Sequence, residues 1–234
     1  MENYMSPFDG MPLEEIVERL LPNPEDITIL EAGCGSMSHF RHPANARLVG
    51  IDISEDQLEK NTLLQEKIHG DLEEYVLPAN AYDLIICWDV LEHLPKPQKA
   101  LSNFARAVAP GGLILLASPN VLSLRGLLTK ISPHWLKVLY YRYVVGQRDA
   151  GRPGTYPFKS YHRLSISPRS IEKFAVRNRL RVAYMGYSSW EHPEDGSRLF
   201  RSIWRPLNTA VSFLSLRRIG TDNEQGFQII LQKP

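Results

Sequence analysis

Short runs of apolar residues alternate with amphipathic segments along the first half of the chain. Between the runs, apolar residues recur every three or four positions, which predicts helices over 12–21, 57–65 and 97–108. The runs 27–31 and 48–52 indicate strands, 67–72 indicates a short third strand, and the more apolar runs 82–88 and 113–118 suit strands buried on both faces. Strands that alternate with helices predict an α/β fold with a parallel sheet covered on both faces.

The pattern becomes irregular after residue 120. Segment 121–165 contains no clear strand and is rich in leucine, aromatic and basic residues, and segment 188–220 is a second irregular stretch. Regular elements return between and after these segments: a helix from Pro168 capped by Ser167, and strands over 181–187 and 226–231. We therefore expect one domain over 1–234 that carries two insertions.

The composition is that of a soluble globular protein. The 234 residues are 43% hydrophobic and 23% charged, which is enough apolar material for a full core. No apolar run approaches the roughly 18 residues needed to span a bilayer, and residues 1–10 show no signal-peptide pattern. Two cysteines, Cys34 and Cys87, make no disulfide framework and are expected to be buried and reduced. These features predict a cytoplasmic protein.

Charge is distributed unevenly along the chain. The net charge is only +1, but residues 1–120 contain 8 Lys and Arg against 19 Asp and Glu. Residues 121–218 contain 18 Lys and Arg against 5 Asp and Glu. Such segregation concerns the partners of a protein rather than its fold, so the basic part needs an explanation of its own.

A glycine-containing loop follows the first predicted strand. Gly33 and Gly35 would bring the backbone close to a ligand, and Asp52 ends the next strand, where an acid can accept hydrogen bonds from ribose hydroxyls. A dinucleotide-binding loop would have a third glycine where Ser38 stands, and the charge of Glu31 would repel a pyrophosphate. A cofactor with an ammonium and a sulfonium, such as S-adenosylmethionine, would be attracted instead. A nicotinamide-dependent oxidoreductase remains the alternative.

Five successive motifs resemble those of class I S-adenosylmethionine-dependent methyltransferases: "LEAGCGSMS", "VGIDIS", "HGDLEEY", "YDLIICWDVLEHL" and "APGGLILLASPN". The resemblance covers residues 26–120, with weaker agreement at 161–187 and 226–232. It implies a Rossmann-like fold with a mostly parallel, seven-stranded sheet. The cofactor-binding half would be 26–120, a lid or insertion would be 121–165, and a second basic insertion would be 188–220.

The resemblance also implies which residues meet the methionine end of the cofactor. Glu31 would lie near the ammonium, and the backbone at Gly33 and Gly35 would approach the carboxypropyl chain and the sulfur. Trp88 and Asp89, after the fourth predicted strand, would also lie at this end. Asp89 could instead be a solvated turn carboxylate.

At the nucleoside end, the resemblance assigns Asp52 to the ribose hydroxyls and Ile53 to the adenine face. Asp71 would accept a hydrogen bond from the adenine amine, and Leu72 would supply a backbone contact. A turn carboxylate is again the alternative for Asp71. Met37 stands where the family often has a further glycine, so its side chain is expected to help shape the pocket.

The segment "DVLEHL" supplies candidates for catalysis. His93, with Glu92 beside it, could take a proton from an acceptor hydroxyl near neutral pH. The segment is similar to the Glu-x-x-Glu-His segment of ubiquinone-pathway O-methyltransferases, in which these residues are associated with a divalent metal. Asp89, Glu92 and His93 match it with Asp in place of the first Glu, but a metal here would need a fourth group from elsewhere, so no metal site is assigned firmly. Glu92 and His93 could also be a structural turn pair. His162 is a further catalytic candidate.

Basic residues flank apolar and aromatic residues in 121–145 and 198–218, a pattern typical of interfacial helices. Contact with an anionic membrane is one interpretation, a lid over the active site is another, and RNA binding is a third. The predicted reaction is O-methylation of a small or lipid-like acceptor: a quinol, phenol, carboxylate or lipid-linked glycan. An RNA-modifying methyltransferase and an inactive cofactor-binding protein remain alternatives, although the Asn/Asp-Pro-Pro-Tyr motif typical of base-modifying enzymes is absent.

Overall fold

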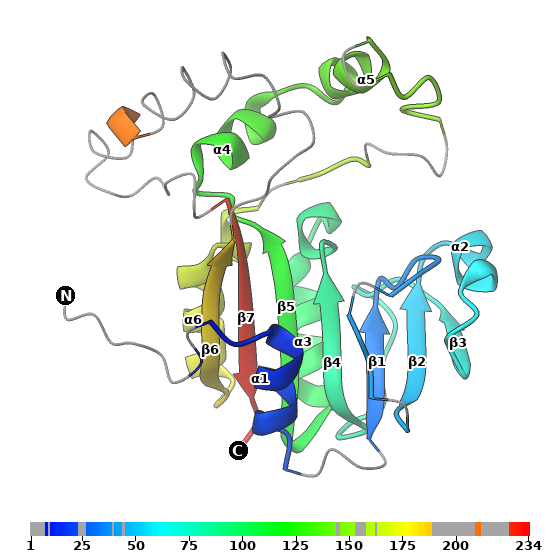
Figure 1. The fold of residues 1–234 in the computed structure, drawn as a ribbon, viewed down its shortest axis with the longest axis vertical. Helices are drawn as coiled ribbons and strands as arrows, with labels where there is room; N and C mark the ends of the chain where they lie inside the picture. Colours follow the sequence, from blue (N-terminus) through cyan, green and yellow to red (C-terminus); the bar gives the residue numbers. More distant parts are fainter. Residues whose placement is uncertain are drawn as a thin grey trace.

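The computed structural model describes residues 8, 10–22, 27–38, 40–43, 45–143, 146–152, 158–161, 163–188, 209–211 and 225–234. These residues form a seven-stranded sheet in the order β3-β2-β1-β4-β5-β7-β6, in which β7 runs antiparallel to both of its neighbours (Figure 1). The strands are β1 (Thr28–Ala32), β2 (Arg47–Asp52), β3 (Glu66–His69), β4 (Tyr82–Trp88), β5 (Val108–Pro119), β6 (Arg181–Ser188) and β7 (Gly226–Gln232). The predicted α/β fold with a mostly parallel sheet is confirmed.

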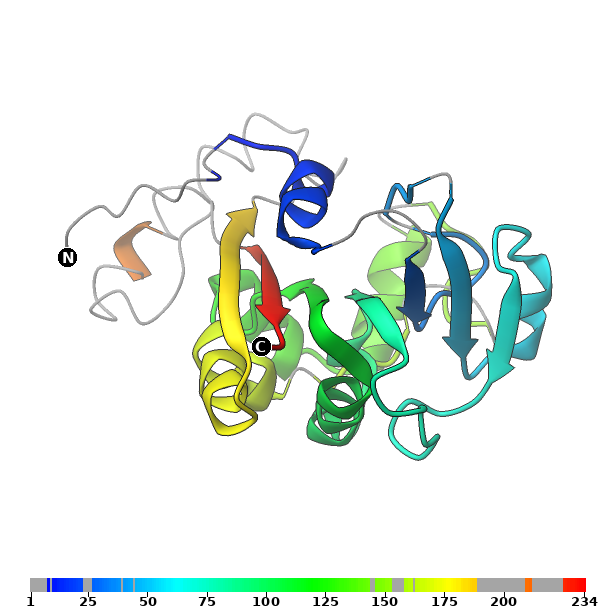
Figure 2. The ribbon, with the colours of Figure 1, turned by 90° about the horizontal axis from the view of Figure 1, so that it is seen from below.

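Helices cover both faces of the sheet. The helices are α1 (Leu13–Leu20), α2 (Glu55–Lys60), α3 (Pro97–Ala107), α4 (Leu124–Ile131), α5 (His134–Tyr143) and α6 (Pro168–Arg177), with single 3-10 turns η1 (Leu91–His93) and η2 (Leu164–Ile166). Figure 2 shows α1 on one side of the sheet and α3 and α6 on the other. Neighbouring strand residues point to opposite faces, so Ile29 packs on the α1 side and Leu30 on the α3 side. This two-sided burial explains the nearly continuous apolar runs.

Three predicted elements, one helix and two strands, have clearly different boundaries in the structure. The helix expected over 57–65 is α2, which ends at Lys60 because Asn61 turns the chain: its buried side chain accepts a hydrogen bond from the Leu63 amide at 3.2 Å. Strand β5 begins five residues earlier than predicted, directly after α3, so the glycines at 111 and 112 lie inside it. The third strand ends at His69, which leaves Asp71 and Leu72 in the following turn.

The crossover between β1 and β2 contains no helix in its described residues, 33–38, 40–43 and 45–46. Parallel strands are usually joined by a helix, which packs on the sheet and fixes the connection. Here the amides of Gly33 and Cys34 donate to the carbonyl oxygen of Ile51, at 2.7 and 3.3 Å. At the other end of the loop the Ala46 amide donates to the carbonyl oxygen of Pro43 at 3.1 Å, and side-chain contacts hold the residues between.

The first insertion lies beyond the carboxyl ends of β4 and β5, where α4 and α5 extend over the edge of the sheet (Figure 1). Helix α4 packs tightly on the turn after β5, because a Cβ added at Gly126 would lie 2.3 Å from the carbonyl oxygen of Asn120. Most of the second insertion, 188–220, lies outside the described residues. None of the described helices is both long and apolar enough to cross a membrane.

Candidate functional site

Gly33 brings the end of β1 against the chain that follows β4. Its φ is +73°, in the left-handed region that favours glycine, and a Cβ there would lie 2.5 Å from Cγ2 of Val90. Gly35 also has a positive φ, +52°, but a Cβ there would meet only Gln57 Oε1, at 3.9 Å. The first glycine is thus required for close packing, and the second lies beside open space that a ligand can fill.

Asp52 fastens the glycine loop to the end of β2. Its Oδ2 accepts a hydrogen bond from the Gly35 amide and its Oδ1 accepts one from the Ser54 amide, each at 2.8 Å. A carboxylate oxygen can accept two hydrogen bonds, so both oxygens retain a free lone pair. This geometry suits an acid that accepts from two neighbouring hydroxyls.

Glu31 is buried at the end of β1, with 4% of its surface exposed. Its Oε1 accepts hydrogen bonds from Ser38 Oγ and from His42 Nε2, the latter at 2.8 Å. Its Oε2 is also buried but has no protein hydrogen-bond partner among the described residues. A buried carboxylate oxygen without a donor is unfavourable, so the site lacks one donor that a ligand can provide.

The residues expected around adenine lie on the loops after β2 and β3. Ile53 has 69% of its surface exposed and can pack against an aromatic ligand, and Met37, in the loop after β1, is 61% exposed beside the same edge. Asp71 Oδ1 accepts a hydrogen bond from the Glu73 amide at 2.8 Å, as expected for a turn carboxylate. Leu72 is buried in the core, and only its backbone remains for a ligand contact.

Asp89 follows β4, next to the half-buried Trp88, in a strained conformation with φ +54°. Its amide donates to the carbonyl oxygen of Ala117 at 2.9 Å, which fixes this conformation. Burial raises the pKa of Asp89 to about 8, and the neighbouring Glu92 carboxyl adds to the increase. Its Oδ1 is buried with no hydrogen-bond partner in the described part of the chain.

The side chains of Glu92 and His93 form hydrogen bonds with different groups. Glu92 accepts a hydrogen bond from Ser118 Oγ at 3.2 Å, and burial raises its pKa to about 7. His93 Nδ1 lies 2.9 Å from the carbonyl oxygen of Lys159, so Nδ1 carries the ring proton and Nε2 has a free lone pair. Burial lowers the pKa of His93, and the charge of Lys137 acts in the same direction. The imidazole is therefore neutral near pH 7 and able to accept a proton.

The possible metal ligands Asp89, Glu92 and His93 are not recognised as a ligand set in the described residues. In the ranges that the structure describes, no group of three His, Cys, Asp or Glu side chains is arranged to hold a metal ion. Glu92 Oε1 and His93 Nε2 are 4.0 Å apart, and each side chain is engaged elsewhere. His162 lies outside the described residues.

Sequence reasoning missed the groups that orient these side chains. Ser118 comes from the end of β5, and the Lys159 carbonyl comes from the end of the first insertion. Ser38 and His42 belong to the helix-free crossover. No spacing rule connects such groups to a glycine loop, and only the folded chain brings them together.

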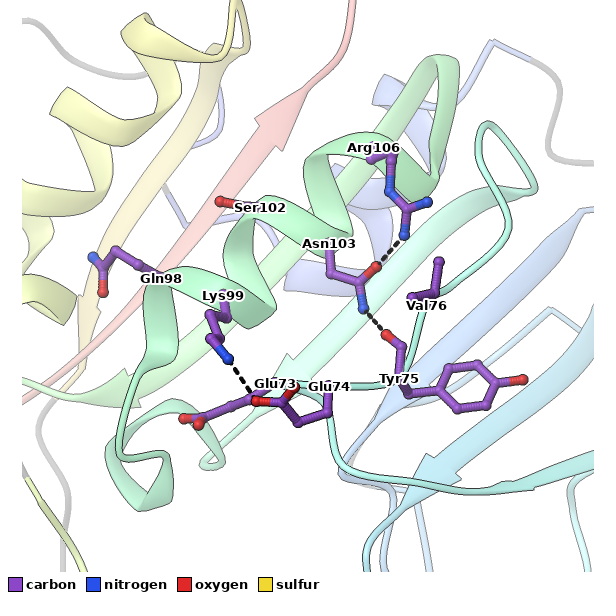
Figure 3. Close-up of a pocket in the computed structure, with 9 residues that line it drawn as sticks. All are labelled: Glu73, Glu74, Tyr75, Val76, Gln98, Lys99, Ser102, Asn103 and Arg106. Atoms are coloured by element: carbon purple, nitrogen blue, oxygen red, sulfur yellow. Dashed lines mark hydrogen bonds and ion pairs between the residues drawn. The ribbon is translucent and has the colours of Figure 1, made fainter.

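The structure also has an open groove of about 560 Å³ on the outer face of α3 (Figure 3). Its lining residues are Glu73, Glu74, Tyr75, Val76, Gln98, Lys99, Ser102, Asn103 and Arg106. The dashed lines in Figure 3 mark polar groups that pair within the groove, such as Asn103 Nδ2 with the Tyr75 carbonyl oxygen at 2.6 Å. It contains none of the expected site residues, so the candidate site remains the carboxyl edge of β1, β2 and β4.

The residues at this edge fit S-adenosylmethionine. The unpartnered Glu31 Oε2 can accept from an ammonium, and the space beside Gly35 can hold the chain that carries it. Asp52 retains two acceptor positions for ribose hydroxyls, and Ile53 offers an exposed apolar face. Each of these features is present without any rearrangement of the backbone.

Comparison with known sequences gives a family match and partial relatives. The family described as "Methyltransferase domain" matches residues 9–178. A ubiquinone biosynthesis O-methyltransferase of Coxiella burnetii is 31% identical over 101 residues, which is 39% of this chain and 43% of that protein. The corresponding enzyme of Hydrogenovibrio crunogenus is 30% identical over 106 residues, or 41% and 44% of the two chains. The matches thus span less than half the length of these relatives.

Solved structures extend the fold comparison to nearly the whole chain. An S-adenosylmethionine-dependent methyltransferase from Archaeoglobus fulgidus aligns with a TM-score of 0.55 and 18% identity, covering 94% of this chain and 92% of that one. A putative methyltransferase of the same kind from Listeria monocytogenes aligns with a TM-score of 0.58 and 13% identity, covering 94% and 96%. The chain therefore belongs to the methyltransferase-domain family and has the class I fold of S-adenosylmethionine-dependent methyltransferases.

Proposed function

We propose that this methyltransferase transfers the methyl group of S-adenosylmethionine to an oxygen atom of a small or lipid-like acceptor. The observation that carries the proposal is the state of His93, whose Nδ1 is bonded to a carbonyl oxygen while Nε2 keeps a free lone pair. A hydroxyl must lose its proton when it is methylated, and a neutral imidazole with a free nitrogen can accept that proton. Similarity to ubiquinone biosynthesis O-methyltransferases supports an oxygen acceptor.

The cofactor would be held at both ends by residues of the carboxyl edge. Glu31 would accept from the ammonium, Asp52 would accept from the ribose hydroxyls, and Ile53 would pack on adenine. The cofactor supplies an electrophilic methyl group on a sulfonium. The nearby Asp89 carboxyl, which has a free buried oxygen, would face this positively charged end.

A bound cofactor would supply its methyl group to the acceptor oxygen and leave as S-adenosylhomocysteine, and this chain would hold the acceptor and take up its proton. The hydroxyl proton moves to His93 Nε2 and is later released to solvent. Orientation of the two reactants can supply roughly 7–11 kcal/mol of the barrier, and proton removal by a positioned base typically adds about 10²–10⁴-fold. Binding and orientation are therefore the larger part of the work of this chain.

The proposal is tested with S-adenosylmethionine labelled in its methyl group and separate pools of quinols, phenols, carboxylic acids, lipid-linked glycans and RNA. We expect label in an ether or ester of a non-nucleic-acid pool, and loss of that product in a His93→Gln variant. Label on nitrogen or carbon, or label only in RNA, would contradict the proposal. Binding of NADH without binding of S-adenosylhomocysteine would support the oxidoreductase instead.

We further propose that α5 contacts an anionic membrane and so gives the site access to a lipid-like acceptor. No described side chain of α5 is buried, and its exposed apolar residues are Trp135, Leu136, Leu139, Tyr140 and Tyr143. Lys137 and Arg142 lie on the same short helix. Exposed aromatic residues next to basic ones are typical of helices that lie on a membrane surface.

A further inference from the structure

Three polar side chains, the buried Glu31 and the partly buried Ser38 and His42, form a cluster at the end of β1. Ser38 Oγ donates to Glu31 Oε1, and His42 Nε2 lies 2.8 Å from both of these oxygens. The side chains of His42 and Glu31 have exposed fractions of only 8% and 5%. Polar side chains are rarely buried at this depth unless they bond to one another or to a ligand.

The contacts fix the tautomer of His42. Nε2 faces a carboxylate oxygen, so it carries the ring proton and donates. Nδ1 is buried without a hydrogen-bond partner among the described residues. Nε2 is therefore the donor through which His42 holds Glu31.

The cluster also takes the place of a helix in fixing the crossover. Ser38 Oγ accepts from the Phe40 amide at 3.1 Å, which turns the chain back toward β1, and Phe40 is buried in the core. The tilted rings of Phe40 and His42 are 5.9 Å apart. His42 is therefore held both by packing against Phe40 and by its hydrogen bond to Glu31.

We propose that His42 is a positioning residue for the amino-acid end of the cofactor, an inference that rests on the proposed use of S-adenosylmethionine. By donating to Oε1, His42 fixes the Glu31 carboxylate and leaves Oε2 as the acceptor for the cationic ammonium. Its effect is confined to ligands that contain the amino-acid group.

Two ligands separate this role from a general structural one. S-adenosylhomocysteine carries the ammonium, whereas 5′-methylthioadenosine has the same thioether nucleoside without it. In a His42→Phe variant, which keeps a ring but loses the donor, calorimetry should show S-adenosylhomocysteine binding weakened about tenfold, the effect of roughly one hydrogen bond to a charged group. Binding of 5′-methylthioadenosine should change by less than about twofold.

A His42→Gln variant retains an N–H donor near the position of Nε2 and should recover most of the affinity for S-adenosylhomocysteine. The matched control is Asp83→Ala, which removes a hydrogen bond of 2.9 Å to Thr28 at the opposite end of β1 and should leave both affinities unchanged. Equal weakening of both ligands in His42→Phe, or unchanged binding of both, would overturn the role of His42. Failure of the unmodified protein to bind S-adenosylhomocysteine would instead overturn the cofactor assignment.

Discussion

At the scale of single residues, burial shifts the pKa values of titratable groups in the candidate site away from their ordinary values. Glu92 is 3% exposed, and burial raises its pKa to about 7. The folded protein then binds a proton that the unfolded chain has already lost above its ordinary pKa of 4.5. Stability therefore falls as pH rises from about 4.5 to about 7 and stays at the lower value above this window.

Replacement of Glu92 by Gln should remove this loss of stability at higher pH. At pH 8 we expect the variant to be more stable than the unmodified protein by about 2 kcal/mol, which is a few degrees in Tm, and to be nearly equal to it at pH 5. Thermal unfolding at the two pH values measures the effect. The same substitution at the exposed Glu18 is the control and should change neither value. An identical pH dependence in Glu92→Gln and in the unmodified protein would contradict the prediction.

The lowered pKa of His93 leads to an expected pH dependence of the reaction. Burial lowers its pKa below the ordinary value of 6.5, so the base is deprotonated and active at pH 7. Activity should fall as pH decreases through that lowered pKa, and it should be flat above pH 7 as far as this group is concerned. In His93→Gln we expect kcat to fall about 10²–10⁴-fold and to lose this limb of the profile, with unchanged binding of S-adenosylhomocysteine. Weakened binding and an unchanged profile would indicate a structural role for the turn.

At the scale of elements, the apolar pattern predicted the central strands well because β1, β2, β4 and β5 are largely buried on both faces, whereas the exposed β3 was predicted less accurately. The limits of β4 were predicted to the residue, since Tyr82 and Trp88 enclose a segment that is apolar except for Asp83. The error at α2 arose because residues 61–65 contain apolar positions that continue the helical spacing, whereas the buried Asn61 ends the helix through its own hydrogen bonds. Such local competition between side chain and backbone leaves no trace in an apolar pattern.

In the candidate site, too, some features could be predicted from the sequence and others could not. The glycine loop and Asp52 could be recognised because their spacing follows from the length of strands and turns. The partners of Glu31 and His93 come from His42 and from the carbonyl of Lys159, and neither has a fixed distance in sequence from the group it orients. The roles of the site residues remain predictions.

Helix α5 permits a direct test of membrane contact. We expect the protein to cosediment with vesicles that contain phosphatidylglycerol, and to bind less to vesicles of phosphatidylcholine alone or at high salt, because basic residues contribute through charge. A Trp135→Ser and Tyr143→Ser double variant should bind several-fold less. The control is Val176→Ser on α6, an equally exposed apolar residue at 76%. Equal binding to both kinds of vesicle, or to neither, would contradict the proposed contact.

At the scale of the whole molecule, the last residues of the chain join elements that are distant in sequence. Strand β7 lies between β5 and β6, so the sheet is complete only when residues 226–232 insert (Figure 1). Gln232 Nε2 then donates to the carbonyl oxygens of Leu20 and Gly111, each at 3.1 Å. These bonds connect the end of α1 to the amino end of the sheet.

The side chain of Lys233 forms hydrogen bonds at the carboxyl-terminal end of α3. Its Nζ donates to the carbonyl oxygens of Ala105 and Val108, at 3.2 and 2.8 Å, and to Asn80 Oδ1 at 2.8 Å. A cation near a helix C-terminus interacts favourably with the helix dipole and with carbonyl groups that lack partners within the helix. Lys233→Met keeps a chain of similar length but removes all three bonds, and it should lower the free energy of unfolding in urea by about 1–2 kcal/mol. The same change at Lys60, in the exposed last turn of α2, should have little effect. Equal stability of the two variants would show that the end of α3 is held by the packing of β7 alone.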